Sequence, residues 1–193
     1  MRSPREGMVV SAALLIRERG AHATAISDVL AHSGAPRGSA YHHFPGGRTQ
    51  LLCEAVDYAG EYIAALIDQA GGGLDLLDAM IEWYREQLLS TDFRAGCPIA
   101  AVAVEAGEPQ NRERMAPVVE RAAAVFERWS ELIAARLVVH GVAPDRAAEL
   151  ATLTLSALEG ALLLARARRD LAPLDVVHRQ LREAFERSLP DDQ

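Results

Sequence analysis

The chain has 193 residues, of which half are apolar and 24% are charged, as in globular proteins that are long enough to bury a sizeable core. Its two cysteines exclude a disulfide framework and favour a reducing compartment, so we expect a cytoplasmic protein. No apolar run approaches the ~20 residues of a membrane span, and none follows the first arginines as in a signal peptide. We therefore expect neither membrane insertion nor secretion.

Charge is distributed unevenly along the chain. Residues 1–52 contain six arginines and three acidic residues, a net charge of +3, and four of the six histidines. The remaining 141 residues contain 14 arginines and 24 acidic residues, a net charge of −10. A locally basic segment suits contact with phosphates, although an excess this small also arises by chance.

The N-terminal 47 residues contain the start and stop signals of three helices. Residues 3–6 (Ser-Pro-Arg-Glu) form a capping box with proline at the first helical position, and Gly20 ends the first helix. Thr24 is predicted to cap a second helix, which Gly34 closes. Pro36 is predicted to begin a third helix, which a Pro-Gly-Gly sequence stops.

Helical signals continue to the C-terminus, and no alternating strand pattern is present in the sequence. Proline and glycine mark most of the boundaries. The next three predicted helices run from Arg48 to about Ala70, from about Leu74 to Leu89 and from Pro98 to Glu105. The one after them starts at Gly107–Pro109, is kinked or restarted by Pro117 and ends at Gly141, and the last two begin at Pro144 and Pro173. We predict an all-α fold of about nine helices.

Residues 24–51 have the pattern of a helix-turn-helix, in which the second helix enters the major groove of DNA. Gly34 permits the turn between the helices, and Pro36 fixes the first turn of the recognition helix. Arg37 can bond guanine or phosphate, and a small Ala40 can contact a thymine methyl group. Ser39 can also reach DNA, while Tyr41 and His42 suit phosphate oxygens, which position a protein without reading sequence.

The spaced residues of this segment resemble the DNA-binding domain of the TetR/AcrR family of transcriptional regulators. The segment Tyr-His-His-Phe-Pro-Gly-Gly and the later Gly96–Ala100 resemble the LmrA/YxaF-like subgroup. The resemblance implies a homodimer that binds operator DNA, with residues 1–47 as the helix-turn-helix domain and 48–193 as the ligand-binding and dimerisation domain. The matching positions are Thr24, Val29, Gly34, Gly38, Tyr41, His43, Phe44, Arg48 and Leu51.

Combining the motif with the resemblance gives a predicted DNA-binding set. Arg48 belongs to it because a cation at a helix N-terminus suits a phosphate. Two positions depart from the family pattern, since many relatives have Ser in place of Pro36 and Lys in place of Arg48. The full set is Thr24, Arg37, Gly38, Ser39, Ala40, Tyr41, His42, His43 and Arg48.

The resemblance also implies a ligand cavity in the C-terminal bundle. Aromatic side chains line apolar pockets, although at helical spacing they also form ordinary core. The predicted lining is Tyr62, Trp83, Tyr84, Phe126 and Trp129. Glu105 would select a cationic ligand if it were buried, and otherwise it is solvated.

In the family the last two long helices pair with those of a second subunit. Residues 144–165 are apolar on more than one face, which fits either this interface or a central core helix. Small residues there permit close approach of another helix. The predicted interface residues are Leu155, Leu158, Leu162, Val177 and Leu181.

Other functions are less well supported by the sequence. The histidines at 32, 42 and 43 lack a carboxylate or cysteine at ligand spacing, so we expect no metal and no cofactor. Cys97 precedes a helix, where a thiolate is stabilised, which keeps a redox sensor open beside a buried capping role. No nucleophile–base set is visible, so an enzyme is the weaker hypothesis, and a helical adaptor is another. The favoured function is a repressor that a small, largely apolar effector releases from a palindromic operator.

Overall fold

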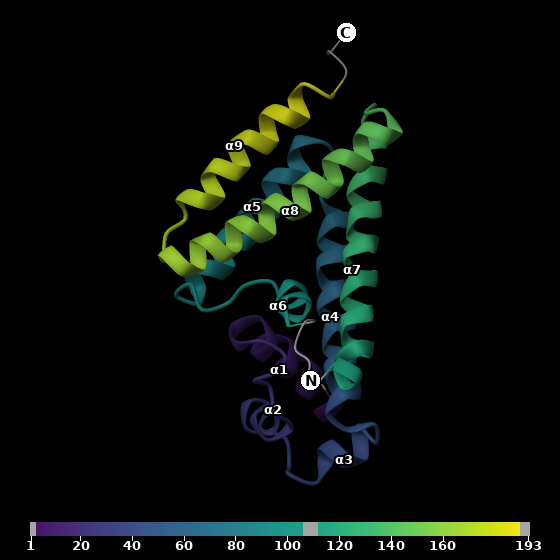
Figure 1. Cartoon of the computed structure of the whole chain (residues 1–193), viewed down its shortest axis with the longest axis vertical. Coiled ribbons are helices and arrows are strands. Elements are labelled where there is room, and N and C mark those ends of the chain that lie inside the picture. Colours follow the sequence, from purple (N-terminus) through teal and green to yellow (C-terminus); the bar gives the residue numbers. More distant parts are fainter. Residues whose placement is uncertain (1–2, 106–111, 190–193) are drawn as a thin grey trace. The chain divides into compact units, whose positions relative to one another are not determined.

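The computed structural model describes residues 3–105 and 112–189. Within these ranges it contains nine helices and no strand, which confirms the predicted all-α class (Figure 1). The chain forms two compact units, one of Met1–Tyr62 with Cys97–Val125 and the other of Ile63–Gly96 with Phe126–Gln193. The division falls within α4 (Gly47–Gln69) and α7 (Arg112–Val139).

The first unit is built on α1 (Pro4–Arg19), which contacts α2 (Ile26–Ser33), α3 (Ser39–His43) and α6 (Pro98–Val104). The predicted capping box is present: Ser3 Oγ accepts the Glu6 N–H at 3.2 Å, and Glu6 Oε2 accepts the Ser3 N–H at 2.8 Å. One face of α1 buries large and small apolar side chains at helical spacing, which organises this unit. They are Met8, Val9, Ala12, Ala13 and Ile16.

Two predicted helix starts in this unit are wrong. Residue 25, not Thr24, caps α2, because Thr24 is buried and its hydroxyl donates to the Gly20 carbonyl at 2.8 Å. The α3 helix begins at Ser39 rather than Pro36. The Pro36 carbonyl accepts both the backbone N–H and the hydroxyl of Ser39, at 2.9 and 2.6 Å, and so forms a turn before the helix.

The second unit contains α5 (Leu74–Ser90), α8 (Pro144–Arg168) and α9 (Ala172–Glu186). It also contains the C-terminal parts of α4 and α7. The α9 helix contacts both α8 and α5. Asp78 of α5 anchors α9 through His178 and Arg182, each with a contact of 2.6 Å. The core of the second unit includes Leu77, Ile81, Leu88, Trp129, Ile133, Leu158, Leu162, Leu174, Leu181 and Phe185.

Two expectations about the long helices need correction. Pro117 does not restart a helix, because α7 continues through it from Arg112; the start predicted at Gly107–Pro109 lies outside the described residues. Helix α8 is long and apolar enough, by length and composition alone, to cross a membrane, although its uninterrupted apolar runs are short. A core helix in a soluble protein passes the same test, and residues along one face of α8 are buried in the second unit.

Candidate DNA-binding surface

The turn between α2 and α3 is organised by backbone geometry. Gly34 has φ 69°, a left-handed conformation that costs side-chain-bearing residues about 1–2 kcal/mol. Ala40 and Phe44 are each 1% exposed, so they anchor α3 and its end in the core of the first unit. The guanidinium of Arg5 lies 5.4 Å from the centroid of the Phe44 ring and covers it.

Burial of Ala40 corrects one predicted contact. In a helix of five residues only one side can face the core, and Ala40 occupies that side. Its methyl group is therefore unavailable to a thymine methyl group. The remaining side of the turn and helix is open to solvent.

The open side of residues 37–43 brings together most of the predicted DNA-binding side chains. Arg37, Gly38 and His42 are exposed, and Tyr41 is 73% exposed, an unusual position for an aromatic side chain. Ser39 and His43 are half-buried. Arg37 forms no ion pair with any residue that the structure describes. We call the outer side of residues 37–43 the outer surface of α3.

Arg48 has a different position. Its Nε donates to the Thr24 carbonyl at 2.9 Å, and its Nη2 donates to the Ala21 and His22 carbonyls at 2.5 and 3.0 Å. Burial lowers the pKa of the guanidinium, and the charge of Glu105 partly offsets this effect. The side chain thus binds the loop between α1 and α2, and this conformation does not offer it to a phosphate.

Thr24 also differs from its predicted role. It is 1% exposed, and its hydroxyl is bound within the same loop that Arg48 holds. Both residues therefore keep the α1–α2 connection in place. The position of each corrects the prediction that it contacts DNA, and we omit both from the proposed interface.

Glu105, which directly follows α6, is a third residue that binds the α1–α2 loop. Its Oε2 accepts the His22 N–H at 2.8 Å. A Cβ on Gly20 would lie 2.1 Å from Glu105 Oε1 and would displace this carboxylate, and the φ of 90° independently favours glycine there. Glu105 is therefore neither a selector of cationic ligands nor an idle solvated group. Sequence spacing gave no sign of this contact, which joins residues 83 positions apart.

The histidines of the motif pack against one another and show no metal site. His42 and His43 have ring centroids 5.1 Å apart in an edge-to-face arrangement, and His43 makes a similar contact with Phe44 at 6.5 Å. In residues 3–105 and 112–189, no group of three metal-binding side chains gathers anywhere. These contacts fit a packing role for His43.

Comparison with known proteins places this surface in a family. Residues 9–55 match the model of the bacterial regulatory proteins of the tetR family, and residues 74–180 match that of the LmrA/YxaF-like transcriptional regulator C-terminal domain. The chain belongs to the TetR family of transcriptional regulators. It is therefore a DNA-binding transcriptional regulator, with the helix-turn-helix in its N-terminal part.

Individual relatives agree with this membership. An uncharacterised HTH-type transcriptional regulator of Mycobacterium tuberculosis is 75% identical over 99% of this chain and 98% of its own length. The uncharacterised regulator YxaF of Bacillus subtilis is 31% identical, with 92% of each chain covered. A TetR transcriptional regulator from Chloroflexus aurantiacus superposes with a TM-score of 0.74 at 29% identity, covering 96% of both chains.

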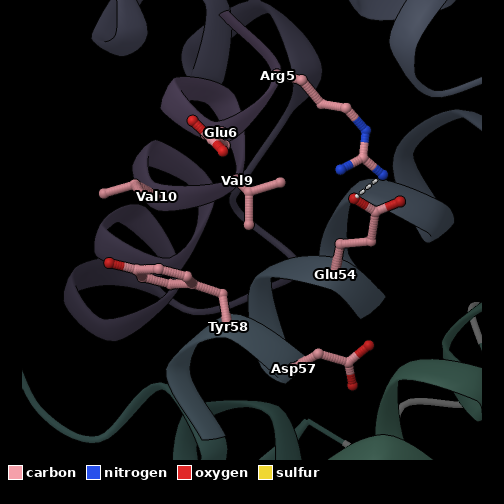
Figure 2. Close-up of a pocket in the computed structure, with 7 residues that line it drawn as sticks. All are labelled: Arg5, Glu6, Val9, Val10, Glu54, Asp57 and Tyr58. Carbon is pink, nitrogen blue, oxygen red and sulfur yellow. Dashed lines mark ion pairs between the residues drawn. The ribbon is translucent and has the colours of Figure 1, made fainter. Parts of the chain in front are cut away.

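A concave site of this TetR-family regulator lies between α1 and α4 (Figure 2), with a volume of about 660 Å³. Its charged groups are already engaged: Arg5 pairs with Glu54 at 2.7 Å, and Glu6 belongs to the capping box. Asp57 pairs with Arg121 of α7. Nothing in the sequence pattern pointed to Glu54 or Asp57, because each acts across helices.

Of the five aromatic residues predicted to line a ligand cavity, two line a groove in the part of the chain that the structure describes. Trp83 and Tyr84 line a groove of about 370 Å³ between α4 and α5 in the second unit. Trp129 is 1% exposed and packs edge-to-face on Phe126 at 5.7 Å, as core residues do. Tyr62 is 48% exposed and does not line this groove.

The residues predicted for the dimer interface need a similar correction. Leu158, Leu162 and Leu181 are at most 2% exposed, because they form the core of the second unit. Leu155 and Val177 are half-buried. The large apolar side chains that remain exposed on α8 and α9 are Leu153, Leu163, Leu164 and Val176, between 47% and 52% exposed.

Both cysteines are buried, which bears on the redox alternative. Cys97 is the N-cap residue of α6 and is 5% exposed, and its side chain makes no capping hydrogen bond. Burial raises the pKa of the Cys53 thiol, an effect that Arg121 partly opposes. Reactive cysteines are accessible and have a lowered pKa, so burial disfavours a sensor role for either residue.

Proposed function

We propose that this TetR-family regulator is a homodimeric repressor that a small effector releases from a palindromic operator. Residues 1–47 form the DNA-binding domain and residues 48–193 the ligand-binding and dimerisation domain of this proposal. Two copies of α3 then read successive major grooves about 34–36 Å apart. As a regulator of transcription, it works in the cytoplasm.

One observation carries the DNA-binding part: the outer surface of α3 keeps its polar side chains in solvent, while its inner side is anchored by Ala40 and Phe44. Arg37 is the residue that reads a base, because its guanidinium matches the two acceptors of guanine. Tyr41 and His42, with Gly38, Ser39 and His43 beside them, contact the DNA backbone.

Capture of genomic DNA tests this directly. The purified protein is incubated with sheared genomic fragments, and the retained fragments are sequenced and then measured by gel shift. We expect a shared inverted repeat, bound with an affinity that falls steeply with salt. Uniform retention of fragments, or no retention, contradicts the proposed function and favours an adaptor.

Dimerisation through α8 and α9 is supported by the exposed leucines of α8. Leu163 is 52% exposed, and a Cβ added to Gly160, one turn earlier, would meet no atom within 4 Å, so another helix can approach. Replacing Leu163 by glutamate should shift the protein to monomers in analytical ultracentrifugation. Leu89→Glu on α5, where the leucine is 56% exposed, is the matched control and should leave the dimer intact.

Release requires that the effector prefer a conformation in which α3 is misplaced. The α1–α2 loop is a natural point of control, since Arg48 of α4 and Glu105 after α6 both bind it. Helix α4 begins beside this loop and ends among the residues that line the groove with Trp83. A shift of α4 on effector binding would change the Arg48 contact, and a shift of α6 would change the Glu105 contact.

A further inference from the structure

The groove between α4 and α5 has the size and surface of a small-molecule site. Its volume of about 370 Å³ lies within the usual range for ligand pockets. Ile67 and Met80, at 0% and 8% exposed, form part of an apolar floor. Trp83 and Tyr84 add aromatic surface, with ring centroids 4.8 Å apart in an edge-to-face arrangement.

The charged side chains that line this groove are all of one sign. Glu82 and Glu86 lie four positions apart on α5, and no arginine or histidine of the described ranges lines the groove. Two like charges at this spacing repel each other along a helix. A bound cation relieves that repulsion, and a bound anion adds to it.

We call the edge of the groove at Glu82 and Glu86 the rim. Arg85, which lies between these two residues in the sequence, does not neutralise both carboxylates. Arg85 bonds Asp175 of α9 at 2.5 Å and reaches Glu82 with its Nε at 3.2 Å. Glu86 forms no ion pair within residues 3–105 and 112–189. One carboxylate of the rim is therefore partly paired, and the other is left with its full charge.

We propose that the groove binds an organic cation with an aromatic or aliphatic body, and that molecules of this class are the effector. The assignment as effector rests on the proposed function, whereas binding in the groove does not. The apolar body fills the floor beside Ile67 and Met80. The cationic group lies at the rim, beside Glu82 and Glu86, where the two carboxylates attract it.

Three compounds that share a phenyl group and a short chain test the charge preference. The probes are 3-phenylpropyltrimethylammonium, 4-phenylbutan-1-ol and 4-phenylbutanoate, and binding is measured by calorimetry at low salt. We expect the cation to bind roughly tenfold more tightly than the carboxylate, with the alcohol between them. Equal affinities, a preference for the carboxylate, or no binding of any probe overturns the proposal.

Substitutions locate the binding. The double variant Glu82→Gln with Glu86→Gln keeps the size of both side chains and removes their charges. It should bind the alcohol as the wild type does and lose most of its preference for the cation. Glu131→Gln, a change of the same kind at an exposed position of α7 away from the groove, should keep that preference. An unchanged preference in the double variant overturns the proposal.

The effector role is tested on a captured operator fragment. A cation concentration that just saturates the wild type should weaken its operator binding at least several-fold, and the same concentration should have a clearly smaller effect on the double variant, whose groove it fills only in part. If the cation binds in the groove and operator affinity stays the same, the effector assignment is overturned. If the protein binds no DNA under any condition, the proposed function fails, and the calorimetry still decides whether the groove selects cations.

Discussion

The two sides of the helix-turn-helix use similar polar residues for different purposes. On the inner side, Arg48 and Thr24 have their polar groups bound to backbone carbonyls of the α1–α2 connection. On the outer surface of α3, Arg37 and Tyr41 extend into solvent. An arginine near a DNA-binding helix is therefore not by itself a DNA contact, because its hydrogen-bond partners within the protein decide its role.

This contrast predicts that inner-side changes act on stability and outer-side changes on operator affinity. Gly20→Ala should have the largest effect, a loss of about 3 kcal/mol in the free energy of unfolding. The loss combines backbone strain at φ 90° with displacement of Glu105 from His22. Gly7→Ala, in the open interior of α1, should instead stabilise the protein by about 0.5–1 kcal/mol. Urea unfolding measures the free energy of unfolding of both variants. Equal values would contradict the claim that the α1–α2 loop contributes to stability.

Arg48→Ala should cost roughly 2 kcal/mol, because three carbonyls of the loop lose a charged donor. Arg48→Lys should recover only part of this loss, since one ammonium cannot span the carbonyls as a guanidinium does. Thermal unfolding measures both. An Arg48→Ala variant of wild-type stability that fails to bind the operator would return Arg48 to the DNA interface.

Arg37→Ala should reduce operator affinity at least ~30-fold, since a guanine contact is worth about 1–3 kcal/mol in each half-site. Its free energy of unfolding should stay within ~0.5 kcal/mol of wild type. Arg114→Ala on α7 removes an exposed arginine elsewhere and is the control. Fluorescence anisotropy with a captured operator gives the affinities, and equal binding by both variants would remove Arg37 from the site.

The smallest expected effect concerns Asp78, whose ion pairs join α5 and α9 in the second unit. Burial raises its pKa, but hydrogen bonds and charge from His178 and Arg182 outweigh this, so the pKa is lowered overall. The unfolded state therefore binds more protons, and the stabilisation is present above about pH 4 and is lost as pH falls through the folded pKa.

Because the Asp78 carboxylate is 42% exposed, its contribution is at most ~1 kcal/mol. Asp78→Asn should be slightly less stable than wild type at pH 7, and the difference should shrink at pH 3. Urea unfolding at both values measures it, with Glu131→Gln as the control. A stability difference between the two proteins that grows on acidification would contradict a lowered pKa of Asp78.

Local signals explain most of what the sequence predicted correctly about the fold. The capping box at Ser3 and the prolines that open α6 and α8 depend only on neighbouring residues, and they mark the helix starts within one position. Pro36 misled because a proline suits a turn as well as the first residue of a helix. The difference was decided by Ser39, whose hydroxyl bonds back to Pro36.

The candidate site could be predicted only in part, because contacts between distant residues set burial. The pattern located the outer surface of α3 but gave no sign that Arg48 turns inward or that Glu105 meets His22. Helix α8 is apolar on several faces, so its composition could not separate core leucines from exposed ones. Leu158 and Leu163 have the same residue type and opposite environments.

Hydroxyl-radical footprinting of the operator complex tests the central claim most directly, because the chain offers two exposed tyrosines. Tyr41 is 73% exposed on α3, and Tyr62 is 48% exposed near the end of α4. If the outer surface of α3 binds the DNA, saturating operator should suppress the oxidation of Tyr41 several-fold and leave the oxidation of Tyr62 unchanged. Unchanged oxidation of Tyr41 in a fully formed complex would contradict it.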